Sequence, residues 1–336
     1  MSTPLRMAVI GVGRMGRIHA RILNALDEID LVAVVDSRTE VVDALGTELD
    51  VMPYTSVDAL LSDDSVAAWL IATPTPTHPS LVRSGLSAGL DILCEKPLSL
   101  EPSEGAELGD LANRIGRVLQ VGFWRRFSPP WRAAKAALDQ GAIGEPVMLR
   151  LSQWDADPPP PGFCDPTVSG GLAIDCGVHE FDLAEWLTDS AVTSVTGRNL
   201  RLVDPDVGAS GDVDNLVAML DLGEGVIATV DLSRNCRYGD DVRTEILGSK
   251  GALLIDVLPT GRTRIATAAG VQVLKDSKTG DATAAGIAGQ ARAFAARVRG
   301  KTVDVPMAAA STRAVAIGRA VQRSAETGLP EAVSTR

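Results

Sequence analysis

Apolar residues follow two different patterns along the chain, and the change falls at Pro146. Up to that point, short continuous apolar runs alternate with stretches in which apolar residues recur every third or fourth position. A continuous run such as Val66–Ala72 is typical of a parallel strand covered on both faces, and the three-to-four spacing is typical of amphipathic helices. The first part of the chain therefore predicts alternating strands and helices that build a doubly wound parallel sheet.

From Pro146 on, apolar and polar residues alternate in paired runs that flank short turns. This arrangement predicts β-hairpins and a mostly antiparallel sheet with one packed and one available face. Two alanine-rich stretches, residues 284–299 and Ala308–Thr327, predict closing helices. The predicted hairpin strands are Leu216–Leu222 with Val226–Leu232, Val242–Leu247 with Ala252–Asp256, and Arg262–Thr267 with Val271–Lys275.

The first predicted strand, Met7–Ile10, leads into a G-x-G-x-x-G sequence, residues 11–16, which opens a predicted helix. The first glycine permits a tight turn, the second lets the backbone approach a pyrophosphate, and the third lets the helix pack closely on the strand. A second strand, Leu31–Val35, ends at Asp36, whose carboxylate can accept hydrogen bonds from an adenosine ribose. Strand, loop, helix, strand and acid thus occur in the order that dinucleotide binding requires.

The cofactor that this unit predicts is NAD, because the charge of Asp36 repels a 2′-phosphate. NADP stays open, because Arg38 can pair with that phosphate instead. Further cofactor contacts are expected in the loops after two later strands, since doubly wound sheets bind ligands at the carboxyl ends of their strands. The predicted cofactor-binding residues are Gly11, Gly13, Arg14, Met15, Gly16, Asp36, Ser37, Arg38, Thr73, Thr75, His78, Glu95 and Lys96.

Two groups of charged residues stand directly after predicted buried strands. Glu95 and Lys96 follow the strand Asp91–Cys94. Beside a cofactor, Lys96 can donate a hydrogen bond to a substrate oxygen, and a solvated ion pair is the alternative interpretation. Arg125 and the arginine after it lie between aromatic residues. These arginines can bind an anion, line a domain junction or form structural salt bridges.

A predicted helix after residues 169–171 carries Asp175, His179 and Asp182 at positions i, i+4 and i+7, so that they share one face. A carboxylate one turn before a histidine can hold the tautomer of the ring and stabilise its protonated form. A lone helical histidine is otherwise a structural residue. With a dinucleotide site implied, we predict that His179 and Lys96 converge over its reactive ring. Histidine, with an ordinary pKa of about 6.5, suits the task of general base.

The composition narrows the classes of partner. A net charge of −11 argues against nucleic acid and anionic membrane surfaces. No apolar run reaches the length of about 18 residues that spans a membrane, and the early first strand leaves no room for a signal peptide, so a cytoplasmic location is expected. The four cysteines form no C-x-x-C pair, which favours reduced thiols. Cys176-x-x-His179 has zinc-ligand spacing but no second ligand pair, so we expect no metal site.

Five motifs occur in a fixed order along nearly the whole chain: GVGRMG, IATPTPTH, CEKPL, QVGFWRRF and GGLAIDCGVHEFD. Together they resemble the Gfo/Idh/MocA oxidoreductases, also called the glucose–fructose oxidoreductase family. The stretch NCRYGDDVRTEILGSKG resembles the corresponding part of inositol 2-dehydrogenases. We therefore expect an α/β protein with a Rossmann domain over residues 1–124. Residues 125–336 are expected to form an α+β domain with an open-faced sheet for substrate binding and oligomerisation, and its closing helices can pack back on the first domain.

The resemblance makes Lys96, Asp175 and His179 the catalytic set and makes the bond between Lys96 and Pro97 a candidate cis peptide. Inositol dehydrogenases often carry His and Asn where this chain has Gln153 and Asp155. The predicted substrate is therefore a cyclitol or sugar, and these two differences count against myo-inositol itself while leaving the reaction type unchanged. The predicted substrate-binding residues are Arg125, Gln153, Asp155, Asp175, His179 and Tyr238.

The predicted function is transfer of a hydride between a secondary alcohol of a cyclitol or sugar and NAD, by an enzyme of the inositol 2-dehydrogenase kind. Two alternatives stay open: a non-catalytic, NAD(P)-sensing regulator on the same fold, and a reductase of a sugar, imine or enone. The predicted partner is a small polyol or sugar. The resemblance also implies a homo-oligomer, either a tetramer or a dimer.

Overall fold

The structure is a computed structural model that describes residues 3–62, 66–156, 159–160, 162–258, 262–274 and 281–334. The chain forms two compact units. Unit 1 comprises the chain up to Trp124 together with Ile287–Thr312, and unit 2 comprises Arg125–Gly286 together with the chain from Arg313 on. The sequence analysis assigned residues 287–312 to the second domain while allowing its closing helices to pack back on the first. In the structure these residues belong to unit 1.

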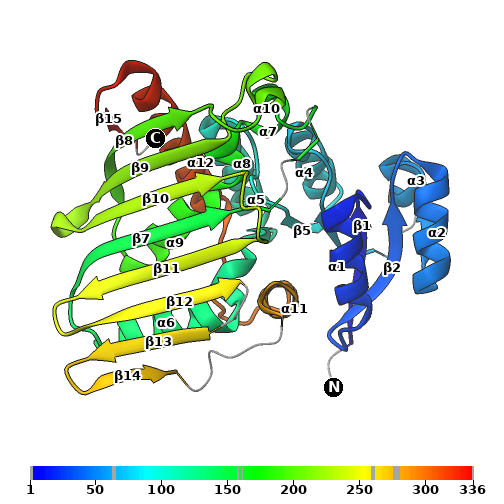
Figure 1. Cartoon of the computed structure of the whole chain (residues 1–336). Coiled ribbons are helices and arrows are strands. Elements are labelled where there is room, and N and C mark those ends of the chain that lie inside the picture. Colours follow the sequence, from blue (N-terminus) through cyan, green and yellow to red (C-terminus); the bar gives the residue numbers. More distant parts are fainter. Residues whose placement is uncertain are drawn as a thin grey trace. The chain divides into compact units, whose positions relative to one another are not determined.

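Unit 1 is built on a six-stranded sheet with the strand order β3-β2-β1-β4-β5-β6, and every neighbouring pair is parallel. This order is that of a Rossmann fold, in which the strand order reverses between β1 and β4. Figure 1 labels β1, β2 and β5 of this sheet. The predicted parallel sheet is confirmed. The strands are β1 (Leu5–Ile10), β2 (Ile29–Val35), β3 (Met52–Tyr54), β4 (Ala68–Ile71), β5 (Asp91–Cys94) and β6 (Leu119–Val121).

Helices connect these strands, and the core lies between helices and sheet. Val9, Val34 and Leu70 of three neighbouring strands are fully buried, and Phe294 packs on the same cluster. Ser56 caps the helix that follows it, because its Oγ accepts a hydrogen bond from the backbone N–H of Ala59 at 3.3 Å. The helices of this part of the chain are α1 (Arg14–Asn24), α2 (Thr39–Leu49), α3 (Val57–Leu61), η1 (Thr75–Thr77), α4 (His78–Ser87), α5 (Pro102–Ile115) and part of α11 (Ala282–Val298).

Unit 2 contains a nine-stranded sheet with the order β14-β13-β12-β11-β7-β10-β9-β8-β15. Only β7 and β10 pair in parallel, and the other neighbours are antiparallel. The three predicted hairpins are confirmed, although Lys275, at the end of the last one, lies outside the described residues. The strands are β7 (Pro146–Trp154), β8 (Val192–Leu200), β9 (Asn215–Leu222), β10 (Ile227–Ser233), β11 (Asp241–Gly248), β12 (Gly251–Leu258), β13 (Arg262–Thr267), β14 (Gly270–Val273) and β15 (Glu331–Ala332).

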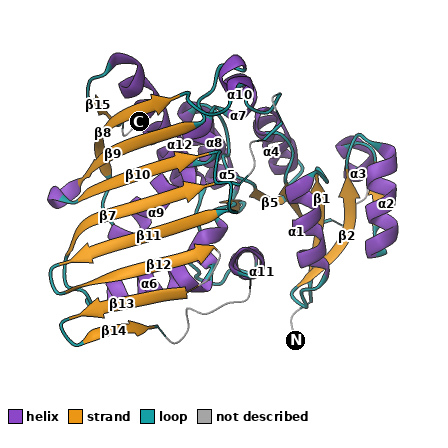
Figure 2. Cartoon of the chain, viewed as in Figure 1, coloured by secondary structure: helices purple, strands orange, loops and turns teal. Residues whose placement is uncertain are grey.

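The two faces of this sheet differ. The helices α6 (Pro129–Asp139) and α9 (Gly177–Thr188) pack against one face, as Figure 2 shows, and alternate strand residues are buried there. The intervening residues point to the opposite face, where Val217, Met219 and Leu247 are close to half exposed. The remaining helices of this part of the chain are η2 (Trp124–Phe127), α7 (Pro166–Ser169), α8 (Leu172–Asp175), α10 (Pro205–Ala209), η3 (Gly223–Gly225) and most of α12 (Ala308–Thr327).

The single helix predicted to carry Asp175 and His179 is wrong in one respect: it is two helices. The helix α8 ends at Asp175, Cys176 forms a turn, and α9 begins at Gly177. A Cβ added to Gly177 would lie 2.8 Å from Cε2 of Phe181 and 3.2 Å from Cδ1 of Leu232 in β10, so the start of α9 leaves little room for a larger residue. Periodicity alone does not contain this packing constraint.

Among the described residues, no helix combines the length and the hydropathy that crossing a membrane requires. Within the same residues, no group of three or more His, Cys, Asp or Glu side chains is arranged to hold a metal ion. Cys94, Cys164, Cys176 and Cys236 are buried and free of disulfide bonds.

Candidate active site

The glycine loop of unit 1 has the geometry that a bound pyrophosphate requires. Gly11 has φ +86°, and a Cβ on Gly16 would lie 1.9 Å from the carbonyl oxygen of Gly11. A Cβ on Gly13 would meet no atom within 4 Å, so the loop is open on that side. The helix α1 follows Gly13 without a side-chain cap. Its first backbone N–H groups can therefore donate to a phosphate, and the residues present fit a dinucleotide.

Two alanine variants should separate the packing role of this loop from its binding role. Gly16→Ala forces a Cβ onto backbone, and we expect a loss of stability of about 1–3 kcal/mol, measured as a lower Tm and a lower urea midpoint. Gly13→Ala is the matched control, because its Cβ enters open space and should leave the Tm close to wild type while weakening dinucleotide binding. A wild-type Tm for Gly16→Ala would contradict the close packing of α1 on β1.

Asp36, at the end of β2, ties that strand to the glycine loop. Its Oδ2 accepts a hydrogen bond from the backbone N–H of Val12 at 3.0 Å. The guanidinium of Arg38 donates to both carboxylate oxygens, at 2.8 and 2.9 Å. Chiefly through this bond from Arg38, the pKa of Asp36 is lowered to about 2. The carboxylate is therefore ionised at neutral pH and placed where a ribose is expected, while Ser37 and Arg38 are exposed beside it.

His78 bridges the loops that follow β4 and β5. Its Nδ1 lies 2.8 Å from the carbonyl oxygen of Pro97, and its Nε2 lies 2.8 Å from the carbonyl oxygen of Thr73. The hydroxyl of Thr77 donates to Oγ1 of Thr73 at 2.7 Å. The bond between Lys96 and Pro97 is cis, as the resemblance implied. His78 thus holds two loops at the carboxyl edge of the sheet, and a contact of its own with the cofactor stays a prediction.

Glu95 is buried at the end of β5 and is held on both carboxylate oxygens. Its Oε1 lies 2.6 Å from Nε2 of His19 in α1, and its Oε2 accepts the backbone N–H of Lys96 at 3.1 Å. Burial raises the pKa of Glu95, but His19 and Lys96 outweigh that effect and lower it overall. His19 was not among the predicted site residues, because its only signal is an imidazole at an apolar position of an amphipathic helix. The pair links the glycine-loop helix to the residue that precedes Lys96.

A second polar network lies in unit 2, at the end of β7. Gln153 accepts from Nη2 of Arg125 at 2.7 Å and donates through Nε2 to the two carboxylate oxygens of Asp155, at 3.1 and 3.2 Å. The thiol of Cys176 lies 3.3 Å from Oδ2 of the same carboxylate. Three predicted substrate-binding residues are therefore connected to each other and to the turn between α8 and α9.

The arginines of the QVGFWRRF motif form buried salt bridges, which was one of the alternatives left open. Arg125 pairs closely with Glu180, and its guanidinium lies 5.2 Å from the ring centroid of Trp131. Burial raises the pKa of Glu180 despite this partner. Arg126 donates to both oxygens of Asp182, at 2.8 and 2.6 Å. Both arginines thus anchor α9, and a direct substrate contact of Arg125 stays a prediction.

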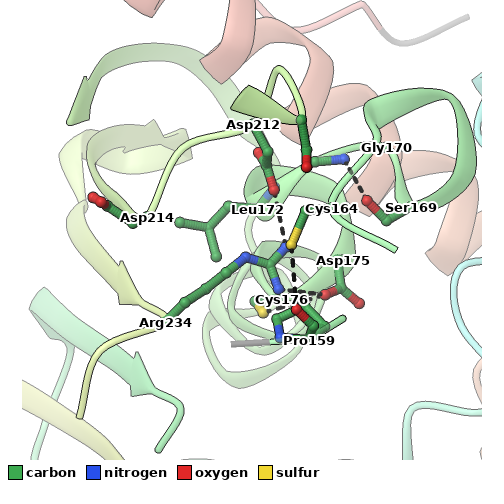
Figure 3. A network of polar contacts seen from close by, with 12 residues as sticks. Pro159, Cys164, Ser169, Gly170, Leu172, Asp175, Cys176, Asp212, Asp214 and Arg234 are labelled. Carbon is green, nitrogen blue, oxygen red and sulfur yellow. Dashed lines mark hydrogen bonds and ion pairs between the residues drawn. The ribbon is translucent and has the colours of Figure 1, made fainter. Parts of the chain in front are cut away.

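Asp175 and His179 flank the turn at Cys176. His179 is buried in the first turn of α9, and its backbone N–H donates to the carbonyl oxygen of Cys176 at 3.2 Å. Oδ2 of Asp175 accepts from Nη1 of Arg234 at 3.1 Å, as Figure 3 shows. The sequence analysis missed Arg234, although its place directly after an apolar strand is the same signal that marked Lys96.

Tyr238 is 70% exposed, and its hydroxyl donates to Oδ2 of Asp241 at 2.7 Å. This hydrogen bond is the main cause that raises the pKa of Tyr238.

The predicted site residues divide between the units. The glycine loop, Asp36, the loop residues up to His78, Glu95 and Lys96 belong to unit 1, and the predicted substrate-binding residues belong to unit 2.

Both halves of the chain match described protein families. Residues 5–123 match the oxidoreductase family with an NAD-binding Rossmann fold, and residues 131–254 match the GFO/IDH/MocA C-terminal domain. The chain is 36% identical to myo-inositol 2-dehydrogenase of Thermotoga maritima, over 75% of this chain and 75% of that protein. It is 33% identical to scyllo-inositol 2-dehydrogenase (NAD(+)) of Bacillus subtilis, over 80% of this chain and 79% of that protein.

Solved structures agree with these sequence matches. The crystal structure of myo-inositol 2-dehydrogenase from Lactobacillus plantarum superposes with a TM-score of 0.86 at 29% identity, covering 98% of this chain and 100% of that chain. The fold, the glycine loop and the matched residues of both units lead to the same assignment. The chain belongs to the GFO/IDH/MocA family of NAD-dependent oxidoreductases.

Proposed function

We propose that this protein oxidises a secondary alcohol of a cyclitol or a related sugar with NAD. The observation that carries the proposal is the similarity of three quarters of the chain to an enzyme named for myo-inositol oxidation. The chain also carries Lys96, Asp175 and His179, to which we assign the acid–base chemistry of this reaction. A protein that only senses NAD has no use for an acid–base pair beside the cofactor.

In the proposed reaction, each residue has one task. The glycine loop and Asp36 hold NAD, which when bound supplies the hydride acceptor. Nε2 of His179 takes the proton of the substrate hydroxyl as general base. Asp175 orients the ring and stabilises the imidazolium. Lys96 donates a hydrogen bond to the same oxygen and stabilises the charge that develops on it.

Substrate selection is proposed to reside in Gln153, Asp155 and Tyr238. The carboxylate of Asp155 is engaged by Gln153 and Cys176, so its position is fixed before a polyol arrives. Fixed carboxylate and amide groups suit the hydroxyl pattern of a cyclitol, because each can accept or donate at a set position. Gln153 and Asp155 differ from the residues that are usual in inositol dehydrogenases. The proposed substrates therefore include inositols other than the myo isomer, and sugars.

A substrate panel tests the proposal. The purified protein is incubated with inositols and aldoses, with NAD and separately with NADP, and reduction is followed at the nicotinamide absorbance. We expect reduction of NAD with at least one cyclitol or sugar. Cofactor binding without any turnover on the panel would favour the regulator, and oxidation of reduced cofactor by an imine or enone alone would favour the reductase.

The preference for NAD should depend on Asp36. Asp36→Ser removes the charge that repels a 2′-phosphate. It also frees the guanidinium of Arg38, which in the wild-type protein pairs with Asp36. We expect the KM for NAD to rise by about 10-fold, and the ratio of NADP to NAD activity to rise with it. Asp30→Ser, at the exposed start of the same strand, is the matched control. An unchanged cofactor ratio in Asp36→Ser would remove this residue from cofactor selection.

We further propose a homo-oligomer, a tetramer or a dimer, in the cytoplasm. The half-exposed apolar residues on the open face of the unit 2 sheet support self-association, because monomeric proteins rarely expose such a row. The net charge of −11 supports a partner that is neither nucleic acid nor an anionic membrane. The mass in solution, measured by light scattering, tests the first part.

A further inference from the structure

Arg234 has a buried guanidinium group and no assigned role in the proposed reaction. It follows β10 directly and is 1% exposed. Nη1 lies 3.1 Å from Oδ2 of Asp175, and Nη2 lies 3.0 Å from Oδ2 of Asp212. Its backbone N–H donates to the carbonyl oxygen of Asp214 at 2.9 Å, so main chain and side chain are both fixed. In Figure 3 the guanidinium lies between the two carboxylates.

The second carboxylate anchors the first helix of the site. Oδ1 of Asp212 accepts the backbone N–H of Leu172, the first residue of α8, at 2.9 Å. Asp175 is the last residue of the same helix. Asp212 and Arg234 therefore hold this short helix at both ends. A helix of one turn has little stability of its own, so these contacts determine where Asp175 lies.

The exposed fraction of the side chain differs among Arg234, Asp212 and Asp175. The side chains of Arg234 and Asp212 are 1% and 5% exposed, whereas that of Asp175 is 17% exposed. Arg234 thus approaches Asp175 from the protein interior, and part of the carboxylate still faces outward. One guanidinium also compensates two carboxylates that would otherwise repel each other.

We infer that Arg234 is a positioning residue, which holds the carboxylate of Asp175 in the orientation that His179 needs. In this role it acts through Asp175 and not on the cofactor or the substrate directly. The inference rests on the proposed function and extends it. It predicts that replacing Arg234 harms the chemical step only as long as residue 175 is an aspartate.

The test is a set of single and double variants assayed with the best polyol of the panel. We expect Arg234→Gln to lower kcat by about 10- to 10²-fold, with little change in KM or in the Kd for NAD, because displacement of a catalytic group mainly costs turnover. Arg234→Lys keeps the charge and should recover most of kcat. In an Asp175→Asn background, Arg234→Gln should add little further loss. Arg313→Gln, which breaks a partly buried pair with Glu185 of α9, is the matched control for stability.

Several outcomes would overturn the inference. If Arg234→Gln multiplies the loss already caused by Asp175→Asn, the arginine acts independently and is merely structural. The same conclusion follows if Arg234→Lys is as impaired as Arg234→Gln. Should Arg234→Gln fail to fold, Arg234→Lys and Asp212→Asn carry the same double-variant comparison. If Asp175→Asn and His179→Ala retain wild-type kcat, the proposed roles of these two residues fail together with the inference. The proposed function itself fails only if the wild-type protein turns over no polyol of the panel, so the two failures can be told apart.

Discussion

With His179 replaced by alanine, we expect the protein to turn over its polyol about 10²-fold or more slowly, because the general base is gone. The Kd for NAD should change little, since the proposed cofactor residues belong to unit 1. Steady-state turnover and a fluorescence titration with NAD measure the two quantities. The dependence of kcat/KM on pH provides a second test. An imidazole must be neutral to accept a proton, so wild-type kcat/KM falls as the pH drops through the pKa of the base, and the variant should lose that dependence.

Glu185→Gln is the matched control for this variant. Glu185 lies on the same helix and pairs with Arg313, and the substitution keeps its size. We expect this control to retain wild-type turnover. If His179→Ala instead retained it, His179 would be a structural histidine of α9, which the sequence alone left as an alternative.

The fold was predictable wherever the pattern of apolar residues within one segment is enough to identify the strand or helix. The strand β5 and the helix α12 have the predicted bounds, because a strand covered on both faces and a long alanine-rich helix each give a continuous signal. The strand β8 was missed, since its sequence VTSVTGRNL has few apolar positions and its end is exposed. The break at Cys176 was missed because the apolar spacing runs on across it from α8 into α9.

The candidate site divides in the same way. The glycine loop, Asp36 and the Glu95-Lys96 pair were readable because each motif is contiguous or sits at a fixed distance from a strand. Their partners were not readable. His19 and Glu95 are 76 residues apart, and Asp175 and Arg234 are 59 residues apart. Such pairs form only when the fold brings separate segments together, and the sequence of one segment does not predict which residue of the other it will contact.

Replacing Lys96 by alanine should also lower kcat by about 10²-fold or more, because it removes the donor that stabilises developing charge on the substrate oxygen. The surrounding loop should stay in place. Glu95 is held by His19, and the carbonyl oxygen of Pro97 is held by His78, so neither anchor uses the ammonium group. We therefore expect a Tm and a Kd for NAD close to wild type. Lys250→Ala, in the exposed turn between β11 and β12, is the matched control.

The double variant Lys96→Ala/His179→Ala tests whether the two side chains act on one oxygen. Groups that act independently give losses that multiply, whereas groups that serve the same transition state give a combined loss well below the product of the single losses. We expect the second result, because His179 removes the proton from the oxygen to which Lys96 donates. A fully multiplicative loss, or wild-type turnover in Lys96→Ala, would separate Lys96 from the reacting oxygen.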